Sequence, residues 1–283
     1  MELKMKSIKG MTLALLMLIA AMAGCIGTED ETSDGAEEEK PAFLDASDAG
    51  YTYASDVDNH RSLMQDLCDI KTAASDSNWD EAKNIYTNGK NAQKSDGSYR
   101  TLAGFAAASG KNHNYDSFYG QDGAIGAHIM AAMDGTGDFT GASDTVRYQG
   151  IAKLTANMGM VGYTIHELNA AVAKADAGNT DNDSGAPHNW DEGWAFFHGP
   201  DEHWSCSPAY TMKKRAADYG TETNGVSNAL AASEQAMVDG LAALQAGDKA
   251  GYDAATETVI KNIIITYSQA TLKYTMKMDN NES

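Results

Sequence analysis

The stretch RYQGIAKLTANMGMVGYTIHELNAAVAKA, residues 147–175, decides the fold. Its apolar side chains recur at alternating steps of three and four residues: Ile151, Leu154, Met158, Val161, Ile165, Leu168 and Val172. Because this spacing places them on one stripe of a helix, it predicts a single helix of roughly 45 Å at 1.5 Å per residue. Gly178 lies just beyond the stretch and is expected to end the helix.

Helical spacing continues on both sides of this stretch. It predicts two further long helices, over 226–246 and 248–278, and shorter ones over 55–74, 79–88, 124–133, 190–199 and 208–219. The segments left as loops are rich in glycine, asparagine and aspartate and cover 90–99, 109–123, 134–144 and 178–188. No alternating strand pattern stands out, and the chain has only four prolines. We therefore expect an all-α fold, a single helical-bundle domain with long loops.

The N-terminus has the pattern of an export signal. Three lysines, Lys4, Lys6 and Lys9, precede an apolar run over 11–23. A helix of that length is too short to cross roughly 30 Å of hydrocarbon. A basic head, a short apolar run and small residues before the cut are typical of a secretory signal, so we assign 1–24 to a signal peptide.

Cys25 follows the small pair Ala23-Gly24. This arrangement resembles the lipobox of prokaryotic lipoproteins, which implies that Cys25 becomes the lipidated first residue; an ordinary signal peptide followed by an accidental cysteine is the alternative. Residues 25–50 are acidic and poor in core-forming side chains, so we expect a flexible tether there. The helical domain then covers 51–283, anchored to the outer face of the cell membrane.

The charge balance excludes one class of partner. The 283 residues contain 21 lysines and arginines against 40 acidic residues, which gives a net charge of −19. Because binding to a phosphate backbone requires a basic face, nucleic acid is not an expected partner. Cations are compatible with this charge, and so is a merely well-solvated surface.

If Cys25 carries lipid, Cys68 and Cys206 remain as an even pair in an oxidising compartment. A disulfide between them and two buried free thiols are both consistent with the sequence. No CxxC motif is present, so thiol redox catalysis lacks its usual signature.

Candidate chemistry concentrates between His166 and His203, where four of the seven histidines lie. On the helix predicted over 190–199, Glu192 shares a face with Ala195, Phe196 and Gly199. A carboxylate buried among such neighbours requires a partner. Histidine together with carboxylate suits first-row transition metals, so we predict a site for iron or a similar ion with Glu192 as its leading ligand.

The remaining candidate ligands are less specific. His166-Glu167 lacks the second histidine of HExxH, and each residue lies roughly 120–140° from the centre of the apolar stripe, at about 100° per residue. His166 is therefore either a ligand or ordinary polar surface, and the two residues face either solvent or a second helix layer. The further candidates, in order after Glu192, are His166, Glu167, Asp191 and His198.

Several segments resemble one known family. These are APHNWDEGWAFFHG (186–199), SPAYTMKKRAADYGT (207–221), the HEL at 166–168 and YTNGKNAQKSDGSYRTLAGF (86–105). Together they are similar to the iron-assimilating family of low-iron-inducible periplasmic proteins, over most of the chain beyond about residue 54. The resemblance implies an iron-responsive, iron-binding protein outside the cytoplasm.

Three functions are weighed on this basis. The first is a membrane-tethered protein that captures iron and assists its uptake, with an iron permease as the receiving partner. The second is a metal-dependent oxidase, such as a ferroxidase, that uses the same residues. Since redox turnover normally needs two metals and the sequence has one carboxylate–histidine cluster, binding is preferred to catalysis. The third is a purely structural surface lipoprotein, against which Glu192 argues.

Overall fold

Helices make up nearly all the regular structure of the protein. The computed structural model describes residues 47–108 and 114–279. These residues lie within one compact unit of the chain, Lys40–Ser283. Its main helices are α2 (Asp58–Ser75), α3 (Trp79–Asn88), α4 (Leu102–Ala107), α5 (Asn114–Tyr119), α6 (Ala124–Asp134), α7 (Asp144–Lys153), α8 (Met160–Asp176), α9 (Ala186–Phe197), α10 (Pro208–Tyr219), α11 (Asn228–Ala246) and α12 (Lys249–Asp279). The all-α prediction is confirmed.

Short elements complete the described part. Two-residue strands form the antiparallel hairpins β1 (Ser47–Asp48) with β2 (Tyr51–Thr52) and β3 (Glu222–Thr223) with β4 (Val226–Ser227). The 3₁₀ turns are η2 (Gly137–Phe139) and η4 (Trp204–Cys206). The predicted signal peptide, the lipidation site Cys25 and most of the predicted tether lie outside the described residues. The first hairpin begins at Ser47, inside the range expected for the tether.

The long periodic stretch is helical throughout but is not one regular helix. Between α7 and α8 lies a π-helical turn, η3 (Leu154–Gly159). A π turn holds an extra residue, which rotates the following helix by about 100° relative to an uninterrupted α-helix. As a result α8 buries Tyr163, Thr164 and Glu167 in addition to Leu168. The single apolar stripe predicted over 147–175 is therefore wrong for its second half, which is covered on two faces.

Most other helix bounds follow the predicted ranges. The bounds of α3 and α10 coincide with 79–88 and 208–219. Helix α9 starts at Ala186 instead of 190, with a proline in its first turn, where the missing N–H costs nothing. The loop predicted over 109–123 contains the short helix α5.

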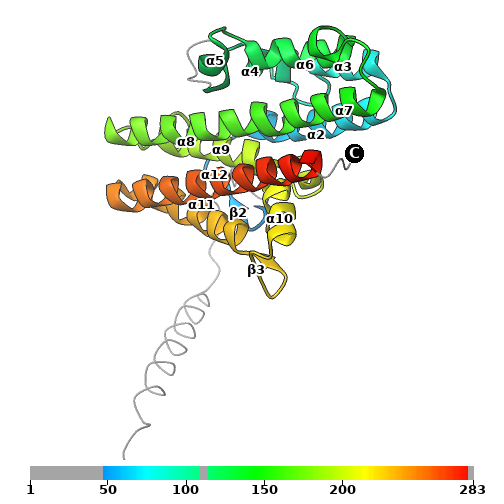
Figure 1. Cartoon of the computed structure of the whole chain (residues 1–283). Coiled ribbons are helices and arrows are strands. Elements are labelled where there is room, and N and C mark those ends of the chain that lie inside the picture. Colours follow the sequence, from blue (N-terminus) through cyan, green and yellow to red (C-terminus); the bar gives the residue numbers. More distant parts are fainter. Residues whose placement is uncertain (1–46, 109–113, 280–283) are drawn as a thin grey trace, which may run out of the picture. The chain divides into compact units, whose positions relative to one another are not determined.

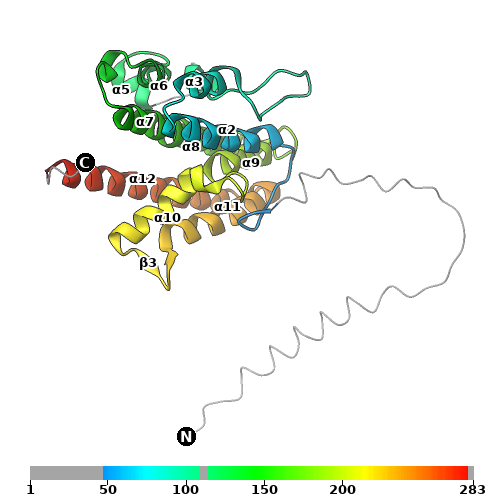
Figure 2. The same cartoon turned by 90° about the vertical axis from the view of Figure 1, so that its right-hand side faces the viewer.

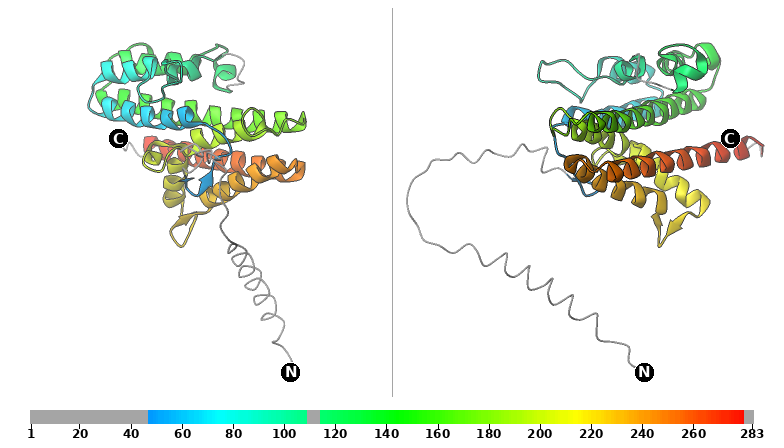
Figure 3. Two further views of the ribbon diagram at one scale, coloured as in Figure 1. Left: turned by 180° about the vertical axis from the view of Figure 1, so that it is seen from behind. Right: turned by 90° about the vertical axis from the view of Figure 1, so that its left-hand side faces the viewer.

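The helices stack in layers, as Figure 1 shows for the unit that begins at Lys40. α2, α7, α8 and α9 lie between an upper group, α3 to α6, and a lower group, α10 to α12. Figure 2 gives the view at right angles and Figure 3 shows the same stacking from two further sides. Helices α11 and α12 pack side by side, and so do α8 and α9.

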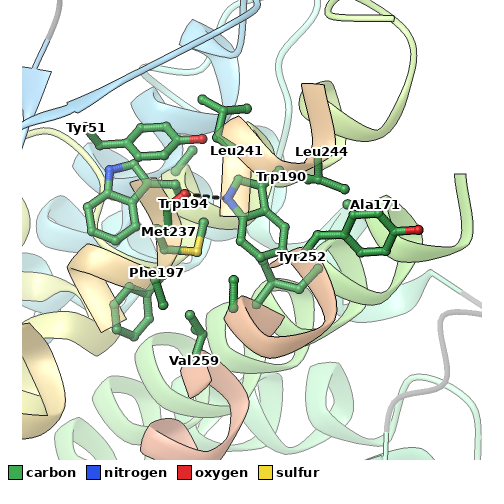
Figure 4. Close-up of a cluster of buried hydrophobic side chains, with 14 of the residues drawn as sticks. Tyr51, Ala171, Trp190, Trp194, Phe197, Met237, Leu241, Leu244, Tyr252 and Val259 are labelled. Atoms are coloured by element: carbon green, nitrogen blue, oxygen red, sulfur yellow. Dashed lines mark hydrogen bonds between the residues drawn. The ribbon is translucent and has the colours of Figure 1, made fainter. Parts of the chain in front are cut away.

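Two hydrophobic clusters fill the spaces between these layers. One lies among α8 to α12, and the other lies among α2, α3, α4, α6 and the start of α8. Figure 4 shows the first, where Trp190 of α9 is fully buried and donates from Nε1 to the carbonyl of Met237 at 2.8 Å. Because α9 contributes Trp190 to one cluster and Phe196 to the other, its position is fixed from both sides.

A disulfide links the first helix of the described part to a distant turn. Cys68 of α2 and Cys206 of η4 are bonded, with their Cα atoms 5.5 Å apart and a sequence separation of 138. Within the residues that the structure describes, no helix combines the length and apolar character needed to span a bilayer.

Candidate metal-binding site

Helix α9 presents a histidine and a glutamate one turn apart. Because the helix already starts at Ala186, His188 and Glu192 stand at positions i and i+4 on the same face. His188 Nε2 lies 3.2 Å from Glu192 Oε1. The glutamate side chain is 13% exposed and the histidine side chain 25%, so the pair lies below the surface.

Helix α2 adds a second imidazole to the same oxygen. His60 Nε2 also lies 3.2 Å from Glu192 Oε1, and His60 is only 4% exposed. Its ring packs edge-on against Phe196 at 5.4 Å and against Phe105 at 6.2 Å. Its other nitrogen, Nδ1, is buried with no hydrogen-bond partner among the described residues. Nε2, which faces Glu192, is therefore the ring nitrogen of His60 that has a polar partner.

Helix α8 contributes a second carboxyl group. Glu167 is 5% exposed, and its Oε2 accepts a hydrogen bond from Asn189 Nδ2 at 2.5 Å. A side-chain hydrogen bond joins it to Glu192. The two helices approach closely because Gly193 has no Cβ: one built there would lie 3.2 Å from Leu168 Cδ2 and 3.7 Å from Glu167 Cβ.

His166 completes the group, with its Nε2 3.9 Å from Glu167 Oε1 and its side chain 20% exposed. We call these five residues from three helices the Glu192 cluster: His60, His166, Glu167, His188 and Glu192. Their shared feature is a set of imidazole nitrogens and carboxylate oxygens that converge below the surface.

Protonation within the cluster is tightly linked. Burial alone would raise the pKa of Glu192, but the hydrogen bond from His188 and the nearby imidazole charges lower that pKa to about 2. The hydrogen bond to Glu192 raises the pKa of His188 above its usual 6.5, against the effect of burial. Burial lowers the pKa of His60 to about 4, despite the attraction of Glu192. Of the two imidazoles beside Glu192, His188 is therefore the one that more readily holds a proton.

A hydrogen-bond chain behind His188 fixes its orientation. Ser55 Oγ donates to Asp191 Oδ2 at 2.9 Å and lies 2.9 Å from His188 Nδ1. Since a hydroxyl has one proton, Ser55 then accepts from Nδ1–H. The neutral form of His188 therefore has its lone pair on Nε2, the atom that faces Glu192. Metal-binding histidines are commonly held by such a second hydrogen bond.

A cavity reaches the cluster from outside. It has a volume of about 280 Å³, and both His60 and His188 line it. Its wall also contains Asp56, Lys94 and Arg100, so its charge is mixed. An ion has room to reach the two imidazoles by this route.

Two predicted candidates have other partners in the structure. Asp191 is fully buried and accepts from Tyr51 OH at 2.6 Å and from the backbone N–H of Ala54 and of Ser55, each at 2.8 Å. His198 is stacked between Trp194 and Trp204. Its Nδ1 lies 2.8 Å from the carbonyl of Gly199, the geometry of an N–H donor to that oxygen. Neither residue adds an atom to the Glu192 cluster by these contacts.

Sequence reasoning missed two members of the cluster, for different reasons. The sequence analysis places His188 in the loop before a helix that starts at 190, whereas the proline before His188 signals the earlier start. His60 lies 132 residues before Glu192, and no local pattern connects the two. Its place follows only from the packing of α2 against α9.

The side chains as placed contact one another instead of surrounding a central ion. Accordingly, no group of three or more histidine, cysteine, aspartate or glutamate side chains in the described part is arranged to hold a metal as it stands. The donor set itself fits a first-row ion: two imidazole nitrogens lie beside one carboxylate oxygen, and a second carboxyl is in contact. Such an ion would replace the protons that now hold the cluster together.

Fold and cluster define a class of protein, an all-α domain with a buried histidine–carboxylate cluster at the junction of three helices. The model of the family described as low iron-inducible periplasmic protein matches residues 42–283, and the chain belongs to this family. The description places the family in the periplasm and relates it to iron supply. No curated protein and no solved structure matches the chain significantly.

Proposed function

We propose that the protein captures iron outside the cytoplasm and holds one ion at the Glu192 cluster. The observation that carries this proposal is the contact of two imidazoles from different helices, His60 and His188, with a single oxygen of Glu192. Glu167 adds a second carboxyl group from a third helix. Such a cluster is costly to bury unless something positive occupies it.

The chemistry of the cluster favours an exchange of protons for metal. A proton on His188 is released when an ion takes its place. Because the ligand helices are fixed by the hydrophobic clusters on both sides, the ligands need only small rotations to surround the ion. The family's description, low iron-inducible, supports iron as the ion. Iron is here the cargo that the protein binds.

The rest of the proposal concerns location. Cys25 carries a lipid that anchors the chain to the outer face of the membrane, and the acidic segment after it serves as a tether. An iron permease receives the ion. Replacement of Cys25→Ser, followed by cell fractionation, tests the anchor: the variant should leave the membrane fraction, and retention equal to that of the unmodified chain would rule lipid anchoring out.

The binding site is tested by metal analysis after equilibrium dialysis against iron. The full chain with Cys25→Ser should retain about one iron per molecule. Glu192→Gln, which keeps the shape and removes the charge, should lower the affinity on the order of 100-fold. Glu257→Gln on the exposed side of α12 is the matched control and should bind as the parent does.

Two results would overturn the proposal. If the parent chain retains no iron, the iron function fails; if Glu192→Gln retains as much as the parent while circular dichroism shows an intact fold, the site fails. Oxygen uptake on addition of ferrous iron, lost in Glu192→Gln, would instead favour the metal-dependent oxidase.

A further inference from the structure

A second, larger pocket lies away from the Glu192 cluster. Its volume is about 1070 Å³, and α2, α7, η4, α10 and the C-terminal end of α12 line it. The disulfide between Cys68 and Cys206 forms part of its wall. Lys71 and His60 both lie on α2, eleven residues apart, which corresponds to roughly 16 Å along the helix. The two sites are therefore distinct.

The charge of this pocket is opposite to that of the chain. Four lysines line it, Lys71, Lys153, Lys214 and Lys277, and no carboxylate does so among the described residues that form its wall. We call it the lysine pocket. This is unusual in a chain of net charge −19. The four ammonium groups repel one another, and without an anion between them their grouping is unfavourable.

The contacts of these lysines leave the positive charge uncompensated. Lys71 Nζ donates to the carbonyl oxygen of Cys206 at 3.0 Å, a neutral partner. Burial, followed by repulsion from Lys153 and Lys214, lowers the pKa of Lys71 to about 8. Lys153 lies over the ring of Tyr274 at 5.4 Å, and Lys214 lies over the ring of Tyr210 at 5.6 Å. These rings attract the ammonium groups without neutralising them.

We propose that the lysine pocket binds a small molecule that carries two or more carboxylate or phosphate groups. Several anionic groups are needed because one small ion would leave most of the lysines unpaired. The volume is that of a pocket for an ordinary small-molecule ligand rather than for a single ion. Tyr148, Gln149 and Ser205 supply further polar groups along the wall.

The test is calorimetric titration of the full chain carrying Cys25→Ser, in metal-free buffer, with citrate and with pyrophosphate as probes. At least one should bind, and the tighter of the two identifies carboxylate or phosphate as the preferred group. Acetate, with one charge, should not compete. Lys153→Gln and Lys214→Gln should each weaken binding about tenfold, the usual effect of losing one charge-assisted hydrogen bond.

Two matched controls separate this pocket from the iron site and from general charge effects. Lys261→Gln removes the same charge from the exposed surface of α12 and should bind as the parent does. Glu192→Gln should also bind each probe as the parent does, so a failure of the iron proposal leaves this result unchanged.

Three results would overturn the proposal. The first is that neither probe binds at millimolar concentration. The second is that both lysine variants bind the probes as tightly as the parent does. The third is lysine-dependent sedimentation with phosphatidylglycerol vesicles in the absence of binding to either free probe, which would assign the pocket to a lipid surface.

Discussion

Asp191 and Glu192 are adjacent on α9, yet their surroundings differ completely. Asp191 is fully buried and faces the first hairpin and the residues after it, where the Tyr51 hydroxyl of β2, the Ser55 hydroxyl and two backbone N–H groups donate to it. Glu192 faces α2 and α8, where it contacts His60 and the carboxyl group of Glu167, and it also contacts His188 one turn earlier on its own helix. The side chains of neighbouring residues on a helix diverge by about 100°, which is enough to give the two carboxyl groups different contact partners.

The comparison shows that burial of a carboxylate does not by itself mark a ligand. The four donors to Asp191, two backbone N–H groups and two side-chain hydroxyls, are all neutral, so its hydrogen-bonding capacity is filled and the contact is structural. Burial raises its pKa to about 6. Glu192 instead contacts His188, whose pKa that contact raises, and a metal ion can take the place of the proton on His188. Ser55 links the two sides because it donates to Asp191 and orients His188.

The largest expected effect is on stability, from Asp191→Ala. This change leaves several buried donors without an acceptor and should lower the free energy of unfolding by about 3 kcal/mol. Urea unfolding measures it, with Asp239→Ala on the exposed face of α11 as the control. A loss below about 1 kcal/mol, similar to that of the control, would contradict the structural role of Asp191.

For Ser55→Ala we expect a smaller loss of stability and a larger effect on iron binding. Loss of the hydroxyl frees Nδ1 of His188, so iron affinity should fall about tenfold, as is usual for partners behind a metal ligand. The free energy of unfolding should fall by only about 1 kcal/mol. Calorimetry and urea unfolding give the two numbers, and Ser117→Ala on the exposed surface of α5 serves as the control. Unchanged affinity would show that Ser55 does not orient a ligand.

The third prediction concerns the effect of pH on iron binding at the Glu192 cluster. The pKa of His188 is raised above 6.5 and that of His60 lies at about 4, so over this interval His188 holds a proton that a metal must displace. Iron affinity should therefore be constant above the pKa of His188. Below that pKa it should fall by at least about tenfold per pH unit. Titrations between pH 5 and 8 measure the slope; an affinity that does not change with pH in this range would exclude His188 as a ligand.

Much of the fold could be predicted from residue spacing. The bounds of α3 and α10 follow from periodicity and capping residues, because those helices are regular and bounded by strong signals. The π turn at Leu154–Gly159 could not be predicted, since apolar residues continue through it at nearly helical spacing. That turn rotates α8 and buries Glu167. A single apolar stripe along the whole stretch would instead predict that Glu167 lies well away from the core.

The candidate site could be predicted only in part. Glu192 was singled out because its helical neighbours are apolar, and the structure shows it 13% exposed beside two imidazoles. His60 contributes through contacts between distant helices, which a single sequence does not encode in any local pattern. Asp191 and His198 share the residue types of ligands, but their hydrogen bonds and stacking depend on Tyr51, Ser55 and Trp204 in other segments.

X-ray absorption spectroscopy at the iron edge tests the central claim most directly, because it reports which groups bind the ion. The iron-loaded chain should show nitrogen and oxygen ligands at about 2.0–2.2 Å, with the outer-shell scattering of two imidazoles. His60→Gln should reduce that scattering to one imidazole, and Asp191→Ala should leave it at two. A spectrum without imidazole scattering, or one that His60→Gln does not change, would contradict the assignment of the ion to the Glu192 cluster.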